Sequence, residues 1–186
     1  AVGAALGIVE PYMSGIGGGG GCMLIYEAET QSVHVLDYLG AAPASANPAT
    51  FGSVDEIDAD VRAATVPSIL AGWFAAHERF GRLDRAALFQ PAIDLAEGGW
   101  PVSPWSETVF RDHAWRLRKH ASSHALLPDG EPPSAGCVVA QTDLAQSYRQ
   151  LASEGPDAFY RGSLGQRLVR SVQSASGWLT KADLAS

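Results

Sequence analysis

The N-terminal part of the chain changes its hydrophobic pattern twice. Residues 1–9 are apolar and uncharged, which is typical of a buried helix, and Glu10 and Pro11 end this run. Residues 17–21 are all glycine. Residues 22–26 then form an apolar run, and residues 33–38 follow after a polar turn at 27–32. The sequence therefore predicts a helix, a glycine loop and a β-hairpin whose first strand is buried.

The rest of the chain has the spacing of amphipathic helices. Apolar residues three and four apart predict a helix with Pro67 in its first turn, ended by Gly81. Capping residues begin further predicted helices at Asp84, Ser103, Asp143, Ser163 and Thr180. Pro91 is expected to break or kink the first of these. Because no repeat or long linker divides the chain, we expect one domain whose second half is mostly helical.

Composition narrows the class of protein. With 186 residues, 46% of them hydrophobic, the chain has the makings of a globular domain with a core. Its net charge of −7 gives no basic surface for nucleic acid or an anionic membrane, so we expect small-molecule or protein partners. Cys22 and Cys137 are too few for a disulfide framework, and we expect two unpaired thiols.

The two ends of the chain indicate a piece of a longer protein. The first residues already have a helical pattern, without an initiator Met or a basic segment, and they are too few to span a bilayer. Residues 180–183 have the pattern of a capping box that opens another helix just before the sequence stops.

The glycine loop matches a nucleotide motif only in its letters. Gly15, Gly17 and Gly20 satisfy G-x-G-x-x-G, but that motif needs a strand before it and a helix after it. Here the order is reversed, and no Lys follows the glycines as a P-loop would require. We therefore expect a backbone that packs where no Cβ fits, or that adopts positive φ, and no nucleotide cofactor.

Other chemical motifs are incomplete. His120 and His124 could share a helix face, but the neighbouring Arg and Lys residues favour a solvated basic surface over a metal site. Ser14 lies outside any nucleophile-elbow pattern, and the acidic residues between Asp55 and Asp60 are typical of a solvated loop. From residue types alone, we find no complete active site and expect neither metal nor cofactor.

Four stretches, taken in order, resemble the front half of the large subunit of the gamma-glutamyltranspeptidase family. They are the glycine stretch 10–20, residues 63–73 (AATVPSILAGW), residues 90–98 (QPAIDLAEG), and residues 155–162 (GPDAFYRG) followed by 177–184 (GWLTKADL). The resemblance covers nearly the whole chain.

The resemblance implies an N-terminal-nucleophile hydrolase of α+β class, an αββα sandwich. Residues 1–186 would be a mostly helical part of the large subunit with a β-hairpin, within one two-subunit domain. A precursor cleaves itself in this family, and the new N-terminal Thr of the small subunit attacks an amide to form an acyl-enzyme. The implied partners are that small subunit and an acyl amide substrate. No catalytic residue is expected in this chain, and the family favours a periplasmic or secreted protein without excluding the cytoplasm.

The resemblance also places a substrate-binding segment after the second strand, at Tyr38 and Leu39. In the family an Arg at the position of Leu39 holds the α-carboxylate of the substrate, whereas Leu offers no donor. Three alternatives remain open: a γ-glutamyl transferase or hydrolase with another cation, a related amidohydrolase or acylase for a different acyl group, and an inactive scaffold or binding protein.

Overall fold

The computed structural model describes residues 1–58, 60–120 and 125–186. The chain divides into two compact units. Unit 1 combines Ala1–Gly15 with Leu83–Glu154, and unit 2 combines Ile16–Arg82 with Gly155–Ser186. Within the described ranges, no helix is both long and apolar enough to cross a bilayer.

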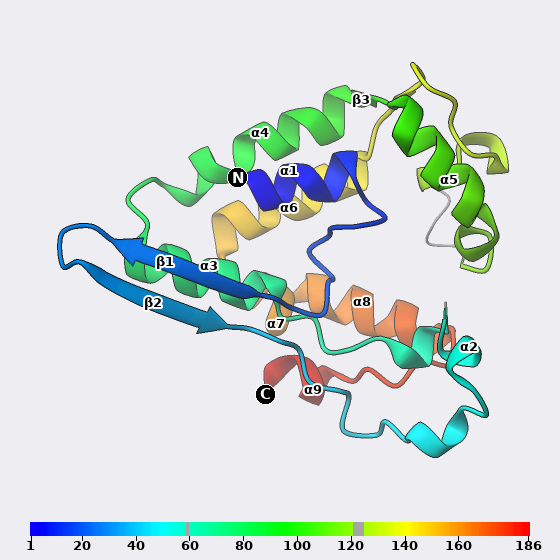
Figure 1. The fold of residues 1–186 in the computed structure, drawn as a ribbon, viewed down its shortest axis with the longest axis horizontal. Coiled ribbons are helices and arrows are strands. Elements are labelled where there is room, and N and C mark those ends of the chain that lie inside the picture. Colours follow the sequence, from blue (N-terminus) through cyan, green and yellow to red (C-terminus); the bar gives the residue numbers. More distant parts are fainter. Residues whose placement is uncertain (59, 121–124) are drawn as a thin grey trace. The chain divides into compact units, whose positions relative to one another are not determined.

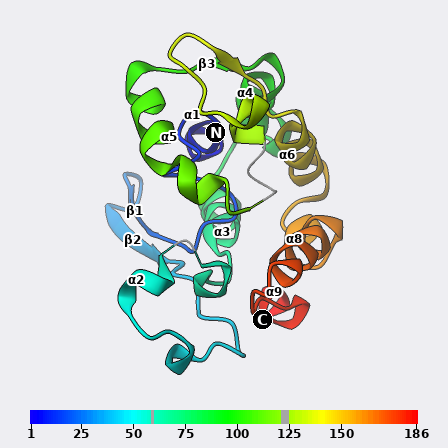
Figure 2. The ribbon, with the colours of Figure 1, turned by 90° about the vertical axis from the view of Figure 1, so that its right-hand side faces the viewer.

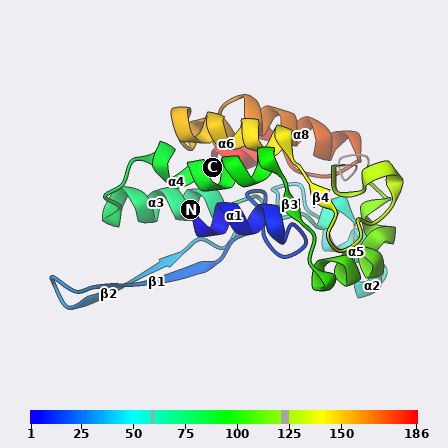
Figure 3. The same cartoon turned by 90° about the horizontal axis from the view of Figure 1, so that it is seen from above.

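Unit 1 is built around three helices that pack together. Helix α4 lies against α1 and α6 (Figures 1 and 3). Tyr148 is fully buried and donates a hydrogen bond of 2.9 Å to the carbonyl of Ala4. The elements of this unit are α1 (Val2–Val9), α4 (Arg85–Gly98), β3 (Trp100–Pro101), α5 (Pro104–Leu117), η4 (Pro128–Gly130), β4 (Val138–Val139) and α6 (Thr142–Glu154).

Unit 2 contains the β-hairpin and helix α3 (Ile69–Phe80), which contacts the second strand. Strands β1 (Cys22–Glu27) and β2 (Ser32–Asp37) pair antiparallel, with Leu24 opposite Val35. Its remaining elements are η1 (Pro48–Thr50), α2 (Val54–Ile57), η2 (Val61–Ala63), α7 (Asp157–Tyr160), α8 (Ser163–Ser174) and α9 (Lys181–Ala185). Helices α8 and α9 lie next to each other (Figure 2).

The predicted order of helix, glycine loop and hairpin is confirmed, but the first strand is not buried in this chain. Side chains alternate between half-buried and exposed along both strands. Leu24 is 71% exposed and Val35 is 64% exposed, although their apolar character predicts burial. The hairpin therefore has one face toward α3 and an open apolar face, formed by Cys22, Leu24, Tyr26, Val33 and Val35.

Several predicted helix ends are displaced by a residue or two. Helix α3 begins at Ile69 with Ser68 as N-cap, so Pro67 lies before the helix and not in its first turn. Helix α6 includes Asp143 in its first turn instead of using it as a cap. Helix α8 is preceded by Gly162, and its predicted cap Ser163 is already helical. The capping box of Thr180 and Asp183 is confirmed.

Pro91 does not break its helix. Helix α4 runs without interruption from Arg85 to Gly98 with this proline inside it, and Gly99 follows with φ +77°. A proline in a helix interior removes one backbone hydrogen bond. The packing of α4 between α1 and α6 offsets that loss.

Candidate functional site

The segment that follows β2 is fixed to the glycine loop by backbone hydrogen bonds. Gly21 and Tyr38 exchange both of their backbone bonds, at 3.4 and 3.0 Å, and so extend the hairpin ladder. The amide of Gly40 then donates a bond of 2.6 Å to the carbonyl of Gly19. The glycine loop therefore extends the hairpin beyond Asp37. The backbone bonds of Tyr38 and Gly40 hold Leu39 in position between them.

Only some of the glycines are required by this packing. A Cβ on Gly19 would overlap the hydroxyl of Thr65, and one on Gly40 would overlap the carbonyl of Val66. Gly20 has φ +129° and lies against the backbone of Tyr38, so it is strained for any other residue. Apart from the chain neighbours, no described residue approaches within 4 Å of a Cβ placed on Gly15 or Gly17. The expectation of a backbone without room for Cβ is thus met at Gly19 and Gly20.

Ser68 holds the same segment from its other side. Its hydroxyl donates a 2.5 Å bond to the carbonyl of Tyr38, and its amide donates a 3.2 Å bond to the carbonyl of Gly18. Val66 adds a 2.9 Å bond from its amide to the carbonyl of Ala41. Residues 38–41 are therefore fastened to the glycine loop on one side and to the entry of α3 on the other.

Tyr38 packs into the scaffold of the site. Its ring lies against the backbone of Gly72 in α3, where any Cβ would overlap it, and against Gly21 of the loop. Gly72 is buried, so the close approach of strand exit and helix depends on the absence of a side chain there. The substrate-binding role expected for Tyr38 stays a prediction, and the visible role of its ring is to fix the following residue.

Leu39 has the opposite environment. Its side chain is 73% exposed, and its amide donates a 3.1 Å bond to the carboxylate of Asp37. It lines a cavity of about 640 Å³ in unit 2. Small and apolar residues form much of the wall, including Ala41, Ala42, Val66, Pro67 and Ala71. Tyr38 is not part of the described lining, so the structure separates the two residues that the sequence placed together.

Three ionic side chains from the C-terminal part of unit 2, those of Asp157, Arg161 and Asp183, complete the cavity. Arg161 pairs with Asp157 at 2.6 Å, and both side chains are well exposed. Asp183 is buried and accepts a 2.8 Å bond from the amide of Ala44. Two further bonds reach Asp183 from the amide and hydroxyl of Thr180, at 2.8 and 2.6 Å. The bond from Ala44 is the main cause of the lowered pKa of Asp183.

Tyr160 joins the cavity wall to helix α3. Its hydroxyl accepts a 2.9 Å bond from the amide of Ala71 and donates a 3.1 Å bond to the carbonyl of Pro67. This satisfies a backbone donor in the first turn of α3 while the Ser68 hydroxyl is directed to Tyr38. Burial is the main cause of the raised pKa of Tyr160, so its phenol stays protonated and keeps both bonds.

The other sequence candidates do not join this cavity. Asp60 pairs with Arg62 at 2.6 Å and caps a turn, while Asp55 and Glu56 are exposed in α2. His124 lies outside the described residues. Among the described residues, no group of three His, Cys, Asp or Glu side chains could hold a metal ion, and both cysteines are free and exposed.

Arg161 is one of the cavity residues that the sequence did not mark as candidates, together with Tyr160 and Asp183. It belongs to the stretch 155–162, whose letters carried the family resemblance, but nothing in a linear pattern connects it with Leu39. Packing of α7 in unit 2 brings both residues to one cavity. A positive charge near a helix end is too common to be noticed from sequence alone.

Comparison with known proteins identifies the family. The sequence model described as "Gamma-glutamyltranspeptidase" matches residues 1–186. The glutathione hydrolase proenzyme of Bacillus subtilis (strain 168) is 35% identical over 187 residues, covering 97% of this chain and 32% of that protein. The acylase ACY 1 proenzyme of Pseudomonas sp. (strain SE83) is 38% identical over 195 residues, covering 98% of this chain and 35% of that protein.

A solved structure agrees with these matches. The gamma-glutamyltranspeptidase of Helicobacter pylori has a TM-score of 0.93 at 30% identity, over 100% of this chain and 55% of that chain. The chain therefore belongs to the gamma-glutamyltranspeptidase family, and its helices with one antiparallel hairpin confirm the expected α+β class of N-terminal-nucleophile hydrolases. It spans about a third of the length of the curated relatives it matches.

Proposed function

We propose that residues 1–186 are the front part of the large subunit of a two-subunit amide hydrolase or acyl transferase. The observation that carries this proposal is the family match over the whole chain. Two relatives of different named activity, a glutathione hydrolase and an acylase, are both called proenzymes, which supports a self-cleaving precursor. The catalytic nucleophile is then a Thr at the start of the small subunit, which no threonine of this chain supplies.

In the proposed reaction, the Thr hydroxyl oxygen attacks the carbonyl carbon of the substrate amide while its proton passes to the α-amine of the same Thr. The C–N bond breaks, the proton leaves with the amine product, and an ester links the acyl group to Thr. Water or an acceptor amine then attacks that ester and releases the acyl group. Residues of this chain bind and orient the acyl group by non-covalent contacts and form no covalent bond to it.

The proposed acyl group lacks an α-carboxylate at the position of Leu39. An open aliphatic side chain, surrounded by small apolar residues, supports an apolar contact there and cannot form the two charged bonds of a guanidinium. On this basis, an acylase or related amidohydrolase is favoured over a γ-glutamyl enzyme.

One observation supports the alternative of a γ-glutamyl enzyme. Arg161 lines the cavity that also contains Leu39 and could hold a carboxylate in its place. Against this, Arg161 is already paired with Asp157 at 2.6 Å, so a substrate anion would have to compete with an existing partner.

The proposed partner surface for the remainder of the protein is the open face of the hairpin. This face presents Leu24, Tyr26, Val33 and Val35 to solvent in the described chain, beside strand edges that could pair further. We expect strands of the small subunit to cover it, which would complete the sandwich as one domain.

The test uses the complete precursor. After expression, N-terminal sequencing of the small subunit should find Thr, and replacing it with Ala should abolish both cleavage and amidase activity. The mature protein is then assayed on γ-glutamyl-p-nitroanilide and on 4-aminobutanoyl-p-nitroanilide, which lacks only the α-carboxylate. Equal or better turnover of the second compound supports the apolar acyl site. Absence of the N-terminal Thr, or of any amidase activity, would leave a scaffold and overturn the proposal.

A further inference from the structure

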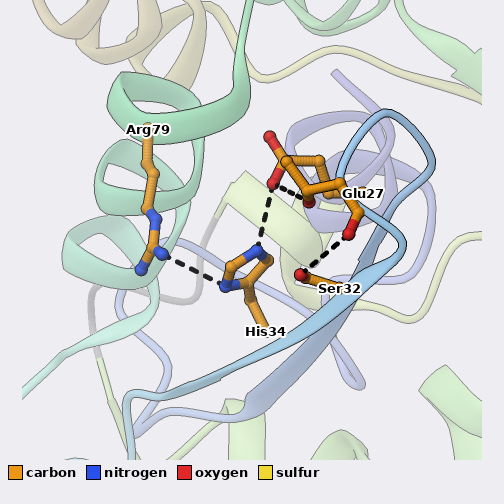
Figure 4. Close-up of polar contacts among 5 residues, drawn as sticks. Glu27, Ser32, His34 and Arg79 are labelled. Carbon is orange, nitrogen blue, oxygen red and sulfur yellow. Dashed lines mark hydrogen bonds and ion pairs between the residues drawn. The ribbon is translucent and has the colours of Figure 1, made fainter.

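A chain of polar contacts connects the hairpin to helix α3. It joins Glu27 of β1, His34 of β2 and Arg79 of α3, all within unit 2 (Figure 4). The Nε2 atom of His34 lies 3.3 Å from Oε2 of Glu27. Its Nδ1 atom lies 3.1 Å from a terminal guanidinium nitrogen of Arg79. Each ring nitrogen of His34 therefore has one partner, and the two partners carry opposite charges.

These partners determine the protonation of the imidazole. A guanidinium has only donors, so Nδ1 of His34 must accept the bond from Arg79. The ring proton is then on Nε2 and is donated to the carboxylate of Glu27. Both contacts can exist together only while His34 is neutral.

Protonation of His34 would act differently on its two contacts. It would place a second N–H and a positive charge against the guanidinium of Arg79, which must then move away. The contact with Glu27 would gain an ion pair, because this carboxylate stays ionised. The hydroxyl of Thr30, which donates a 2.6 Å bond, is the main cause of the lowered pKa of Glu27.

Arg79 has a second contact besides the bond to His34, and this contact does not depend on the protonation of the imidazole. Its guanidinium lies 4.9 Å from the ring centre of Phe80, and the same ring lies 5.0 Å from the ring of His34. Glu27 and Arg79 are the charged groups shown in contact with His34 among the described residues. Glu29 and Arg82 pair with each other at 3.0 Å nearby and line one hollow together with Glu27 and Arg79.

We infer that His34 is a pH-sensitive clasp between the hairpin and α3, closed when its imidazole is neutral and opened when it gains a proton. Opening releases the bond to Arg79 while the bond to Glu27, which lies within the hairpin, is kept. Because β2 continues directly into Tyr38 and Leu39, the clasp acts on the strand that leads into the candidate acyl site. The inference rests on hydrogen-bond geometry and holds whichever acyl group the enzyme takes.

Hydrogen–deuterium exchange of the complete mature protein tests the clasp. Exchange of peptides covering residues 22–37 and 69–80 is measured at pH 7.5 and 5.5 and corrected for the intrinsic effect of pH. Ordinary histidines gain a proton between these values. We expect the corrected exchange of both peptides to rise about 3- to 10-fold at the lower pH. An unchanged corrected rate would overturn the clasp.

Three variants assign the response. His34→Gln keeps a neutral donor and acceptor, and Arg79→Gln removes the charge that opposes protonation, so both should lose the pH response. Arg82→Gln is the matched control, because it removes a neighbouring arginine that pairs with Glu29, and it should respond like the parent. A parent-like response in His34→Gln or Arg79→Gln, or its loss in Arg82→Gln, would assign it to another group.

A measurement on the parent protein alone gives an independent check. In protein labelled with ¹⁵N-histidine, nitrogen shifts at pH 7.5 should show His34 protonated on Nε2 and unprotonated on Nδ1. The opposite tautomer at this pH would contradict the proposed contacts, even if the variants were unstable.

Discussion

The amide of Gly40 donates a 2.6 Å hydrogen bond to the carbonyl of Gly19, and this bond joins the glycine loop to the segment that carries Leu39. Neither residue has space for a side chain. The position of Gly19 is closed by Thr65, and that of Gly40 by the carbonyl of Val66. Of the five conspicuous glycines, Gly19 and Gly20 therefore lie at a strand exit that is packed on both sides.

Replacing the packed glycines should weaken folding of the complete protein. Gly19→Ala must displace Thr65, and Gly20→Ala must hold an unfavourable φ against Tyr38. Each should lower the free energy of unfolding by about 1–3 kcal/mol and reduce precursor cleavage. Thermal unfolding and the fraction of cleaved subunits on a gel measure both effects. Gly17→Ala is the control, because no described atom beyond its two chain neighbours lies within 4 Å of its Cβ position. Equal behaviour of all three variants would refute this account of the loop.

The open hairpin face should be covered in the complete protein. Leu24→Lys would then bury a charge, and we expect it to prevent subunit assembly or to lower the free energy of unfolding by at least about 2 kcal/mol. Val54→Lys is a suitable control, since Val54 lies in α2 and is 81% exposed. Yield of the mature complex and its melting temperature measure the difference. If Leu24→Lys has no larger effect than Val54→Lys, the open face of the hairpin is not an interface.

The open apolar face of the hairpin should also make the isolated chain unstable. Residues 1–186 alone should lack amidase activity and should aggregate or unfold without a sharp transition, because a lone hairpin with an open apolar face is marginally stable. Size-exclusion chromatography and calorimetry test this. A monomeric fragment with a cooperative transition would count against it.

Asp183 should make the complete protein sensitive to acid. Its lowered pKa means that its contribution to stability is present well above pH 3.8, the ordinary value for its side chain. That contribution is lost as the pH falls from 3.8 to below the lowered pKa of the folded state. In this range Asp183 binds a proton more readily in the unfolded chain than in the folded one, so protons favour unfolding.

Asp183→Asn should remove this dependence together with part of the stability. The Ala44 amide bonds to one oxygen of Asp183, whereas the amide and hydroxyl of Thr180 bond to the other. Asn has a single acceptor oxygen, so one of these connections must be lost, at a cost of about 1–3 kcal/mol. Glu131→Gln, which breaks an exposed pair with Arg118, should cost far less. Urea unfolding at several pH values compares the variants. A parent-like acid transition in Asp183→Asn would show that another group is responsible.

Local signals in the sequence predict the first helix, the hairpin and the longer helices, but not the short elements such as α2 and α7 or the surroundings of each element. The hairpin follows from apolar runs around a polar turn, and the last helix follows from the pair Thr180 and Asp183, because both depend on residues close in the chain. The burial of β1 was predicted wrongly because an apolar strand shows only that a partner is needed. In this chain the face that contains Leu24 has no cover among the described residues.

For the candidate site, too, the sequence predicts the segment but not the contacts of its side chains. The resemblance pointed to the segment after β2, but it could not separate Tyr38, whose ring packs against Gly72, from Leu39, whose side chain is open. That difference arises from contacts with α3. The presence of Arg161 at the cavity depends on packing between segments far apart in the sequence, which no local pattern encodes.

We predict that substitution at position 39 changes the acyl preference of the complete protein. Charged hydrogen bonds contribute roughly 1.5–3 kcal/mol, so an enzyme without a guanidinium at position 39 should turn over γ-glutamyl compounds about 10- to 100-fold less efficiently than one with it. Leu39→Arg in the mature two-subunit protein should therefore raise kcat/KM for γ-glutamyl-p-nitroanilide by that factor, because the open side chain leaves room for the longer one. Turnover of the 4-aminobutanoyl compound, which has no α-carboxylate, should change little.

Arg161→Gln distinguishes the two candidate anchors in the same assay. If Leu39 forms an apolar wall, this substitution should leave the kcat/KM ratio of the two anilides unchanged, because Arg161 pairs with Asp157 and does not touch the acyl group. If instead the parent prefers the γ-glutamyl compound strongly and Arg161→Gln removes that preference, Arg161 holds the carboxylate. In that case Leu39→Arg should bring a much smaller gain, since Arg161 already balances the charge of the carboxylate and the two cations repel each other. The ratio of the two kcat/KM values in parent and variants thus decides whether the cavity selects its acyl group by an apolar wall or by a displaced arginine.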